Sequence, residues 1–309
     1  MKRYGRFTAV DGVDLAVPPG EIYGFLGPNG AGKTSTIMML LGIVRPTAGE
    51  ISLFGERFTS ERLDLRRRIG MVPEKHPRGA WQGMTAAEYL GMFAEIFRVP
   101  RAAERMESLL TRVDLWAVRN RRIATLSHGM LQKLSITRAL LHDPDILFLD
   151  EPISGLDPMG IKQTRDLLVS ENRAGRAIFI SSHQLSEMER ICHRVAIISR
   201  GKLLAESTMS GLLARMGEGR EIRVELETVP PDLAEALGRL PTVRGVRVLA
   251  NGIAVRVPAE GDHRKAVSSL LVQRGLVPLS IEVMVPSLEE AFITLTQDTV
   301  AGLAARGRD

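Results

Sequence analysis

The sequence predicts an α/β fold whose sheet region is interrupted by a helical block and followed by a separate α+β domain. Apolar runs alternate with helical patterns before residue 75 and again after residue 144, which is typical of parallel sheets covered by helices. Between them, residues 85–142 carry helical patterns. At 309 residues the chain also exceeds the size at which single cores stop growing. The expected domains are a core of residues 1–75 and 144–218, a helical block of residues 76–143, and a C-terminal domain of residues 219–309.

Composition limits the class of protein. Hydrophobic residues make up 44% and charged residues 25%, which is ordinary for a globular protein. The longest apolar run, residues 37–44, is about half of the roughly 20 residues that span a bilayer, so we expect no membrane span. The single cysteine, Cys192, excludes an internal disulfide, fits a reducing cytosol and is expected to pack in the core.

The charge balance is mildly basic, with 41 Lys and Arg against 36 Asp and Glu. Such a balance suits nucleic acid or an anionic membrane surface, but also an ordinary solvated face. The short basic runs at 66–68 and 119–122 contain no interleaved aromatic residues, which a single-strand binder would need. We therefore favour the solvated face and do not expect nucleic acid as a partner.

The first elements alternate between strand and helix. Residues 21–26 are predicted to form a buried strand that ends at the glycine-rich run 27–30. Residues 34–44 carry a helical pattern, and the turn at 45–49 leads into a strand over 50–54.

The helical block begins with Thr85 and Glu88, whose spacing is that of a capping box. Farther on, Met106, Leu109, Leu110 and Val113 form one apolar stripe, which we interpret as core. Three more strands are then expected, at residues 145–149, 177–180 and 195–198, with a hairpin turn at 199–201.

The C-terminal domain shows a β-α-β-β-α-β order, which suggests a ferredoxin-like unit with an added helix. Its predicted strands are 221–228, 243–249, 253–257 and 279–285, and its predicted helices are 232–238, 263–274 and 287–296.

Residues 27–34 match the phosphate-loop pattern G-x-x-x-x-G-K-[ST], between a strand and a helix as that loop requires. Glycines let backbone N–H groups surround phosphate oxygens, and the helix N-terminus adds its dipole. Lys33 should reach the β- and γ-phosphates, and the Thr34 hydroxyl should bind Mg²⁺. A chance glycine-rich turn is the alternative, which the flanking elements disfavour. The expected ATP-binding residues here are Pro28, Asn29, Gly30, Ala31, Gly32, Lys33, Thr34 and Ser35.

Asp150 and Glu151 follow the apolar strand at 145–149. At a strand end beside the phosphate loop, Asp150 would hold Mg²⁺ through water, and Glu151 would orient or deprotonate the attacking water. Alone, two acids after a strand would more often be a solvated strand end. Together with the loop they predict a nucleoside triphosphatase.

Three further segments narrow the family. Residues 126–132 (Leu-Ser-His-Gly-Met-Leu-Gln) precede the acidic strand, residues 154–157 (Ser-Gly-Leu-Asp) follow it, and residues 181–183 (Ser-Ser-His) end the next strand. Together with the phosphate loop they resemble the ABC ATPase cassette, whose signature sequence normally reads Leu-Ser-Gly-Gly-Gln. The resemblance covers about residues 4–215.

The resemblance implies that ATP joins two copies of the chain face to face, with two composite sites at the interface. Ser127 and the Gly129 amide would bind the γ-phosphate held by the other copy, which suits donors at the start of a helix. Asp157 would lie at the interface, and His183 would contact the γ-phosphate and position the catalytic water. Tyr4 matches the aromatic residue that stacks on adenine, although a simple edge-strand aromatic is an equal alternative.

This sequence departs from the family pattern at several positions. His128 replaces the first glycine of the signature and Met130 its glutamine. Glu74 occupies the place of a metal-contacting glutamine and is expected to add a third carboxylate beside Asp150 and Glu151. Hydrolysis of ATP is still expected.

Residues 286–292 (Pro-Ser-Leu-Glu-Glu-Ala-Phe) resemble the end of the ATPases of the ABC-2 export class. That likeness implies a homodimer on the inner face of the cell membrane, docked on separate permease subunits that export drugs, lipids, polysaccharides or ions. The permease would contact residues 75–84, with Trp81 either as an anchor or packed inside the helical block. The C-terminal domain would support the dimer or, as an alternative, sense a ligand.

Two other functions compete with transport. A soluble ABC ATPase acting on nucleic acid or ribosomes would resemble two cassettes in one chain or carry long coiled coils, and this sequence shows one phosphate loop and no sustained heptads. A metabolic phosphoryl-transfer enzyme would leave residues 126–132 and His183 unexplained.

Overall fold

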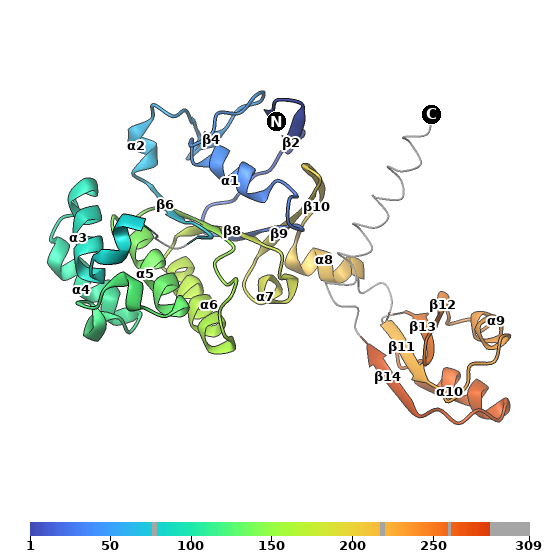
Figure 1. Ribbon diagram of the computed structural model, residues 1–309. Coiled ribbons are helices and arrows are strands. Elements are labelled where there is room, and N and C mark those ends of the chain that lie inside the picture. The colour runs from blue at the N-terminus through green and yellow to red at the C-terminus, as the bar shows by residue number, and fades with distance from the viewer. Residues whose placement is uncertain (76–78, 217–219, 259–260, 285–309) are drawn as a thin grey trace. The chain divides into compact units, whose positions relative to one another are not determined.

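The computed structural model describes residues 1–75, 79–216, 220–258 and 261–284, and it contains two compact units (Figure 1). The first unit is Met1–Thr208 and the second Met209–Asp309. The boundary lies before helix α8 (Met209–Met216), whereas the boundary expected from the sequence lies after it, at residue 218.

A six-stranded sheet forms the centre of the first unit, in the order β10-β9-β3-β8-β7-β6. Its strands are parallel except β10, which pairs with β9 as the predicted hairpin. All residues of β3 and β7 are buried, as expected for parallel strands that are covered on both faces. The strands are β3 (Ile22–Leu26), β6 (Ile69–Val72), β7 (Ile146–Asp150), β8 (Ala177–Ser182), β9 (Arg194–Ser199) and β10 (Lys202–Thr208).

Helices cover both faces of this sheet. Figure 1 shows α1 (Lys33–Leu40) on one side and α5 (His128–Leu140) and α6 (Pro158–Arg173) on the other. The core contains the buried rings of Tyr23, Phe25 and Phe148, packed around Phe179, whose centroid lies 5.6 Å from that of Tyr23. Because β3, β8 and β7 are parallel neighbours, the polar residues that follow them meet at one edge of the sheet.

Two predicted elements are shorter in the structure. Helix α1 ends at Leu40 and not at residue 44, because Gly42 turns into the left-handed region with a φ of 65°. The strand predicted over 50–54 is wrong beyond β4 (Ser52–Leu53). The chain reverses there through Phe54 and Gly55, both with positive φ, into β5 (Glu56–Arg57). Short elements elsewhere are β1 (Lys2–Tyr4), β2 (Phe7–Val10), α2 (Leu63–Arg66) and α7 (Leu185–Glu189).

The helical block consists of α3 (Ala86–Phe97), α4 (Ala102–Arg112), α5 and three short 3₁₀ turns, Gly79–Gly83, Trp116–Val118 and Ile123–Thr125. The capping box is confirmed: Glu88 N donates to Thr85 Oγ1 over 3.1 Å, and Thr85 N donates to Glu88 Oε2 over 2.8 Å. The predicted apolar stripe is also confirmed as core. Trp81 is half-buried, with its ring centroid 5.7 Å from that of Tyr89, which favours the packing alternative over the anchor.

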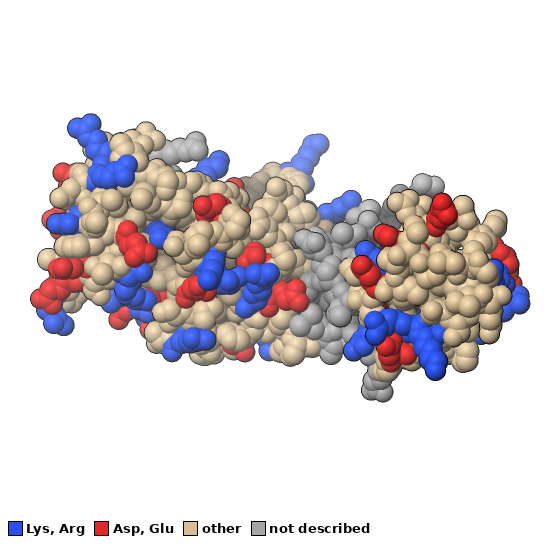
Figure 2. Space-filling model, turned by 90° about the horizontal axis from the view of Figure 1, so that it is seen from below, with Lys and Arg blue, Asp and Glu red and all other residues tan. Residues whose placement is uncertain are grey.

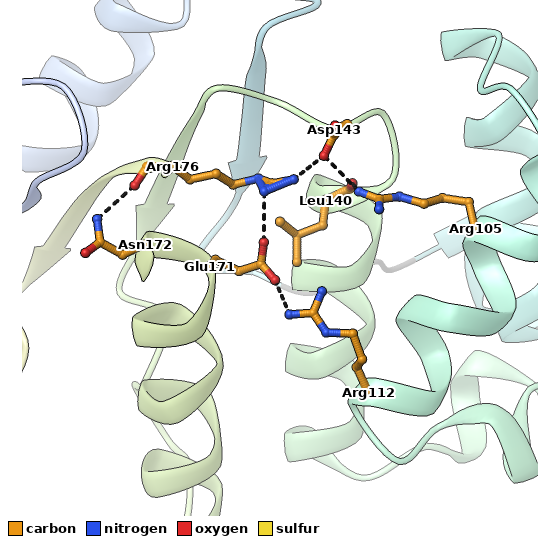
Figure 3. A network of polar contacts seen from close by, with 7 residues as sticks. All are labelled: Arg105, Arg112, Leu140, Asp143, Glu171, Asn172 and Arg176. Atoms are coloured by element: carbon orange, nitrogen blue, oxygen red, sulfur yellow. Dashed lines mark hydrogen bonds and ion pairs between the residues drawn. The ribbon is translucent and has the colours of Figure 1, made fainter. Parts of the chain in front are cut away.

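A network of ion pairs joins α4 of the helical block to α6 and to the residue before β8 (Figure 3). We call this network the ionic anchor. Glu171 of α6 is 2% exposed and accepts hydrogen bonds from Arg112 of α4 and from Arg176, the latter over 3.0 Å. Asp143 also accepts from Arg176 and, over 3.1 Å, from Arg105 of α4. A buried carboxylate is tolerated only when it is paired in this way. The ionic anchor therefore fixes α4 to α6 and to the start of β8.

The second unit contains a four-stranded antiparallel sheet in the order β12-β13-β11-β14. Its elements follow the predicted β-α-β-β-α-β order. Leu233 and Leu237 of α9 and Val267 and Leu271 of α10 pack with the strands in one core. The helix predicted at 287–296 and the motif at 286–292 lie outside the described residues. The elements are β11 (Arg220–Glu225), α9 (Leu233–Gly238), β12 (Gly245–Leu249), β13 (Gly252–Val257), α10 (Arg264–Gln273) and β14 (Ser280–Met284).

Candidate active site

The predicted phosphate loop connects β3 to α1 and is held by close backbone approaches. A Cβ atom on Gly27 would lie 2.4 Å from the carbonyl oxygen of Ile198, and one on Gly32 would lie 2.5 Å from that of Ala9. Gly32 also has a φ of 108°, which a residue with a side chain rarely adopts. Glycine is therefore required at both positions. Residues Pro28, Asn29 and Gly30 are exposed at the tip of the loop, whereas Ala31 is buried and Ser35 partly buried.

Lys33 is turned into the loop and is 6% exposed. Its Nζ donates to the carbonyl oxygens of Gly27 over 2.7 Å and of Pro28 over 3.3 Å. The same Nζ forms an ion pair with Glu151 Oε1 at 3.1 Å. The loop thus holds a cation in the position where the motif requires one to meet phosphate oxygens.

Thr34 and Asp150 lie side by side, as the sequence analysis predicts for a metal site. Thr34 Oγ1 donates to Asp150 Oδ2 over 3.0 Å. The other carboxylate oxygen accepts from the hydroxyl of Ser181, and Asp150 is 3% exposed. Hydroxyl and carboxylate oxygens are the donors that Mg²⁺ prefers, so this pair fits that ion.

Sequence reasoning missed Ser181 as a partner of both acidic residues. Its hydroxyl donates to Asp150 and also accepts from the backbone N–H of Glu151 over 3.2 Å. The signal was present, because Ser181 and Ser182 are polar residues at the buried end of an apolar strand.

Glu151 lies between a cation and an imidazole. Its Oε1 pairs with Lys33, and its Oε2 accepts a hydrogen bond from His183 Nδ1 over 2.8 Å. The side chain of Glu151 is 9% exposed and that of His183 is 41% exposed. The backbone of Glu151 has a φ of 49°, a left-handed conformation that is strained for a residue with a side chain and that clusters at functional sites. A carboxylate so placed can accept a proton from water.

The signature segment begins helix α5, as predicted. Ser127 is the N-cap, and its Oγ accepts from the backbone N–H of Met130 over 3.3 Å. Ser127 is exposed and Gly129 is partly exposed, with open space around its Cα. Lys33 of the same chain contacts Gly27, Pro28 and Glu151, whereas next to Ser127 the His128 Nε2 contacts Ser154 O at 3.1 Å.

The other predicted residues lie around this group. Asp157 is the exposed N-cap of α6 and accepts from Gly160 N over 2.7 Å. Tyr4 ends β1, which pairs with β2, and is 45% exposed with the Lys2 ammonium 4.9 Å from its ring centroid.

Glu74 is exposed in the bend after β6. In residues 1–75, 79–216, 220–258 and 261–284, no three His, Cys, Asp or Glu side chains are placed to hold a metal ion by themselves. Glu74 therefore does not form a three-carboxylate cluster with Asp150 and Glu151 in this structure.

The surface gives no sign of a dedicated polyanion-binding face on the side that Figure 2 displays, where basic and acidic side chains are interspersed over both units. No helix in the described part of the chain is long and apolar enough to span a bilayer. Cys192 is buried with its Sγ 3.8 Å from Met188 Sδ, as expected for a packing residue.

Comparison with known proteins agrees with this site. A family model described as ABC transporter matches residues 10–154. The chain is 38% identical to the bacitracin transport ATP-binding protein BcrA of Bacillus licheniformis, covering 95% of this chain and 94% of the relative. It is 35% identical to the daunorubicin/doxorubicin resistance ATP-binding protein DrrA of Streptomyces peucetius, covering 96% and 90%. It is 31% identical to the linearmycin resistance ATP-binding protein LnrL of Bacillus subtilis, covering 97% of each.

A solved structure described as the ATP-binding subunit of an ABC transporter superposes with a TM-score of 0.63 at 30% identity, covering 69% of this chain and 89% of that one. The likeness to these ATP-binding proteins extends over almost the whole length, including the second unit. The chain therefore belongs to the ABC transporter ATP-binding proteins, and it is the ATP-hydrolysing subunit that works with a membrane permease.

Proposed function

We propose that two copies of this subunit enclose two ATP molecules, that each site is built from both copies, and that ATP-driven closure powers export by separate permease subunits. The observation that carries the proposal is the position of Glu151 between Lys33 and His183, at the end of the strand beside the phosphate loop.

The contacts of Lys33 suggest how substrate binding prepares the site. A phosphate oxygen would offer its ammonium group a stronger partner than the loop carbonyls or Glu151. The carboxylate would then keep only its hydrogen bond to His183 and could accept the proton of the attacking water. Because a carboxylate can only accept, the His183 ring carries its proton on Nδ1 here. It can donate from Nε2 to a phosphate as well only when both nitrogens are protonated.

Mg²⁺ would be held by Thr34 directly and by Asp150 through water, and it would neutralise charge on the β- and γ-phosphates. Ser181 keeps Asp150 oriented, because it occupies one carboxylate oxygen while Thr34 contacts the other.

The second copy would supply Ser127 and Gly129. Both lie at the exposed start of the 13-residue helix α5, where the backbone N–H groups of the first turn and the helix dipole favour an anion. Asp157, exposed at the start of α6, would lie in the same interface, and Tyr4 would cover the adenine.

For cargo, the relatives named for bacitracin, linearmycin and daunorubicin favour an antibiotic-like molecule and an exporting direction. The dimer would then work on the inner face of the cell membrane. Residues 75–84 would meet the permease. Residues 76–78 of that segment lie outside the described structure, and the role of Trp81 there would be to support the segment from the helical block.

We further propose that the second unit is a ferredoxin-like domain that supports the dimer. Its strand order, β12-β13-β11-β14, and the two helices packed with one sheet in a single core support the ferredoxin-like reading. The domain division would comprise the predicted core, helical block and C-terminal domain, with helix α8 assigned to the C-terminal unit.

The test is Glu151→Gln, which keeps the shape of the side chain but removes the proton acceptor. We expect turnover to fall by about 10²–10⁴-fold, while ATP and Mg²⁺ convert the variant into a stable dimer that light scattering can detect. Lys33→Ala is the matched control and should bind nucleotide weakly and stay monomeric. A Glu151→Gln variant that binds ATP but remains monomeric would overturn the composite-site mechanism.

A further inference from the structure

We infer that His128 is a positioning residue, which ties the signature segment to the catalytic carboxylate of its own subunit through the turn at residues 152–156. The inference rests on the proposed composite site, because it assumes that Ser127 and Gly129 meet a phosphate held by the second copy. It assigns a role to the histidine side chain that this chain carries where the family pattern has glycine.

One hydrogen bond makes the first link. His128 is the first residue of α5, directly after the N-cap Ser127, and its Nε2 lies 3.1 Å from Ser154 O. A carbonyl oxygen can only accept, so Nε2 carries the proton and donates it. A glycine at position 128 would leave this bond unmade.

The same imidazole lies against the next residue of the turn. Gly155 has a φ of 72°, and a Cβ atom there would lie 3.1 Å from His128 Nε2 and 3.7 Å from two carbons of the ring. Glycine at 155 therefore provides both the left-handed backbone and the room for the ring. The His128 ring and Gly155 therefore pack closely against each other where the helical block meets the core.

The second link runs from the turn to the catalytic residue. Ser154 N donates to Glu151 O over 3.1 Å, and Ile153, between them, is 3% exposed. Ser154 is thus bonded to Glu151 on its amide side and to His128 on its carbonyl side. Glu151 has a strained backbone with a φ of 49°, so the direction of its carboxylate depends on the turn that follows it.

These hydrogen bonds connect His128, at the start of α5, through Ser154 to Glu151, which carries the catalytic carboxylate. When Ser127 and Gly129 engage a γ-phosphate of the second copy, the first turn of α5 is fixed in place. His128 then fixes Ser154, and Ser154 fixes Glu151 over its own substrate. The two sites of the dimer would be coupled through His128.

The experiment compares His128→Gly with His128→Gln in the full chain with ATP and Mg²⁺, and measures kcat and KM separately. We expect His128→Gly to lower kcat by about 2- to 10-fold, the worth of one hydrogen bond, with KM for ATP unchanged. The glutamine amide can donate to Ser154 O and should restore most of kcat. A kcat of His128→Gly equal to that of the unmodified protein, or a loss that glutamine does not restore, would overturn the inference.

A matched control comes from the other end of the same helix. His142 follows the last turn of α5, and its Nε2 lies 2.9 Å from the carbonyl oxygen of Ile69 on β6. This is also a contact from a histidine to a carbonyl group of the core. We expect His142→Gln to lower thermal stability and to leave kcat unchanged. If His128→Gly shows that same pattern, its role is structural and the inference fails.

A second variant tests the contact in another way. Gly155→Ala crowds the His128 ring, so it should lower kcat more in the unmodified chain than in the His128→Gly background. Equal losses in both backgrounds would count against the link. The outcomes also separate the two proposals: if Glu151→Gln stays monomeric with ATP, the composite site fails, whereas a normal ATP-bound dimer with an inert His128 removes only this inference.

Discussion

Two of the contacts between the helical block and the core differ in construction. At the ionic anchor, Glu171 is 2% exposed and is paired with Arg112 of α4 and with Arg176, which precedes β8, and Asp143 adds a further bridge. At the start of α5, the exposed side chain of His128 contacts the turn after Glu151 through a hydrogen bond of 3.1 Å to Ser154 O.

This difference in burial and charge indicates which of the two contacts can break and reform during a catalytic cycle. Removing one partner of a buried ion pair leaves a charge without compensation, at a cost of about 3–5 kcal/mol. A single hydrogen bond that water can replace contributes about 0.5–1.5 kcal/mol. The ionic anchor thus fixes α4 to the core, whereas the hydrogen bond between His128 and Ser154 can break and reform at little cost in free energy.

The largest effect should come from Glu171→Ala, which leaves Arg112 and Arg176 without their shared carboxylate. Because Arg176 keeps Asp143 and the Arg112 side chain is 41% exposed, we expect the free energy of unfolding of the first unit to fall by about 1–3 kcal/mol in urea titrations. Asp166→Ala is the matched control on the same helix, because the Asp166 side chain is 62% exposed and its ion pair with Arg165 is 3.8 Å long. Equal losses for the two variants would mean that the anchor is no stronger than a surface pair.

A smaller and more selective loss of stability is expected at Ser127, at the start of α5 beside the active site. Ser127→Ala removes an N-cap, as Thr85→Ala does for α3, and each should cost about 1 kcal/mol of stability. Only the Ser127 variant should also weaken the ATP-dependent dimer. Ser127→Asp keeps a good cap but places a negative charge where phosphate would bind, so it should remain stable and fail to dimerise. Normal dimerisation of Ser127→Asp would contradict the proposed contact.

The smallest effect concerns pH at the anchor. Although partial burial opposes it, the hydrogen bond from Arg176 holds the pKa of Asp143 below its ordinary value of 3.8. Because the folded-state pKa is the lower one, this stabilisation is complete above pH 3.8 and is lost as the pH falls below that value. Asp143→Asn should therefore be slightly less stable at neutral pH, and the difference should shrink in acid. A difference in melting temperature that is independent of pH would show that the carboxylate charge contributes nothing.

Much of the fold and site was predictable, because local patterns determine it. The loop at 27–34 and the acids at 150 and 151 follow buried strands, and parallel neighbours bring such strand ends together. The sequence also placed Ser127 at the start of a helix.

The remainder depends on contacts that periodicity does not encode. Ser181 meets Asp150 only because β8 lies beside β7, and the pairing of Glu171 with Arg112 depends on how α4 packs near α6. The strand expected at 50–54 failed for a local reason, since Phe54 adopts a left-handed backbone that its residue type does not announce.

The most direct test of the composite site mixes two inactive variants. Lys33→Ala removes the cation from the phosphate loop, and Ser127→Asp repels phosphate from the signature segment. If each site takes Lys33 from one copy and Ser127 from the other, a mixed dimer contains one site with both residues intact, and ATPase activity should appear on mixing. If the mixture stays as inactive as its components although both variants are folded, Lys33 and Ser127 do not act on the same ATP from different copies.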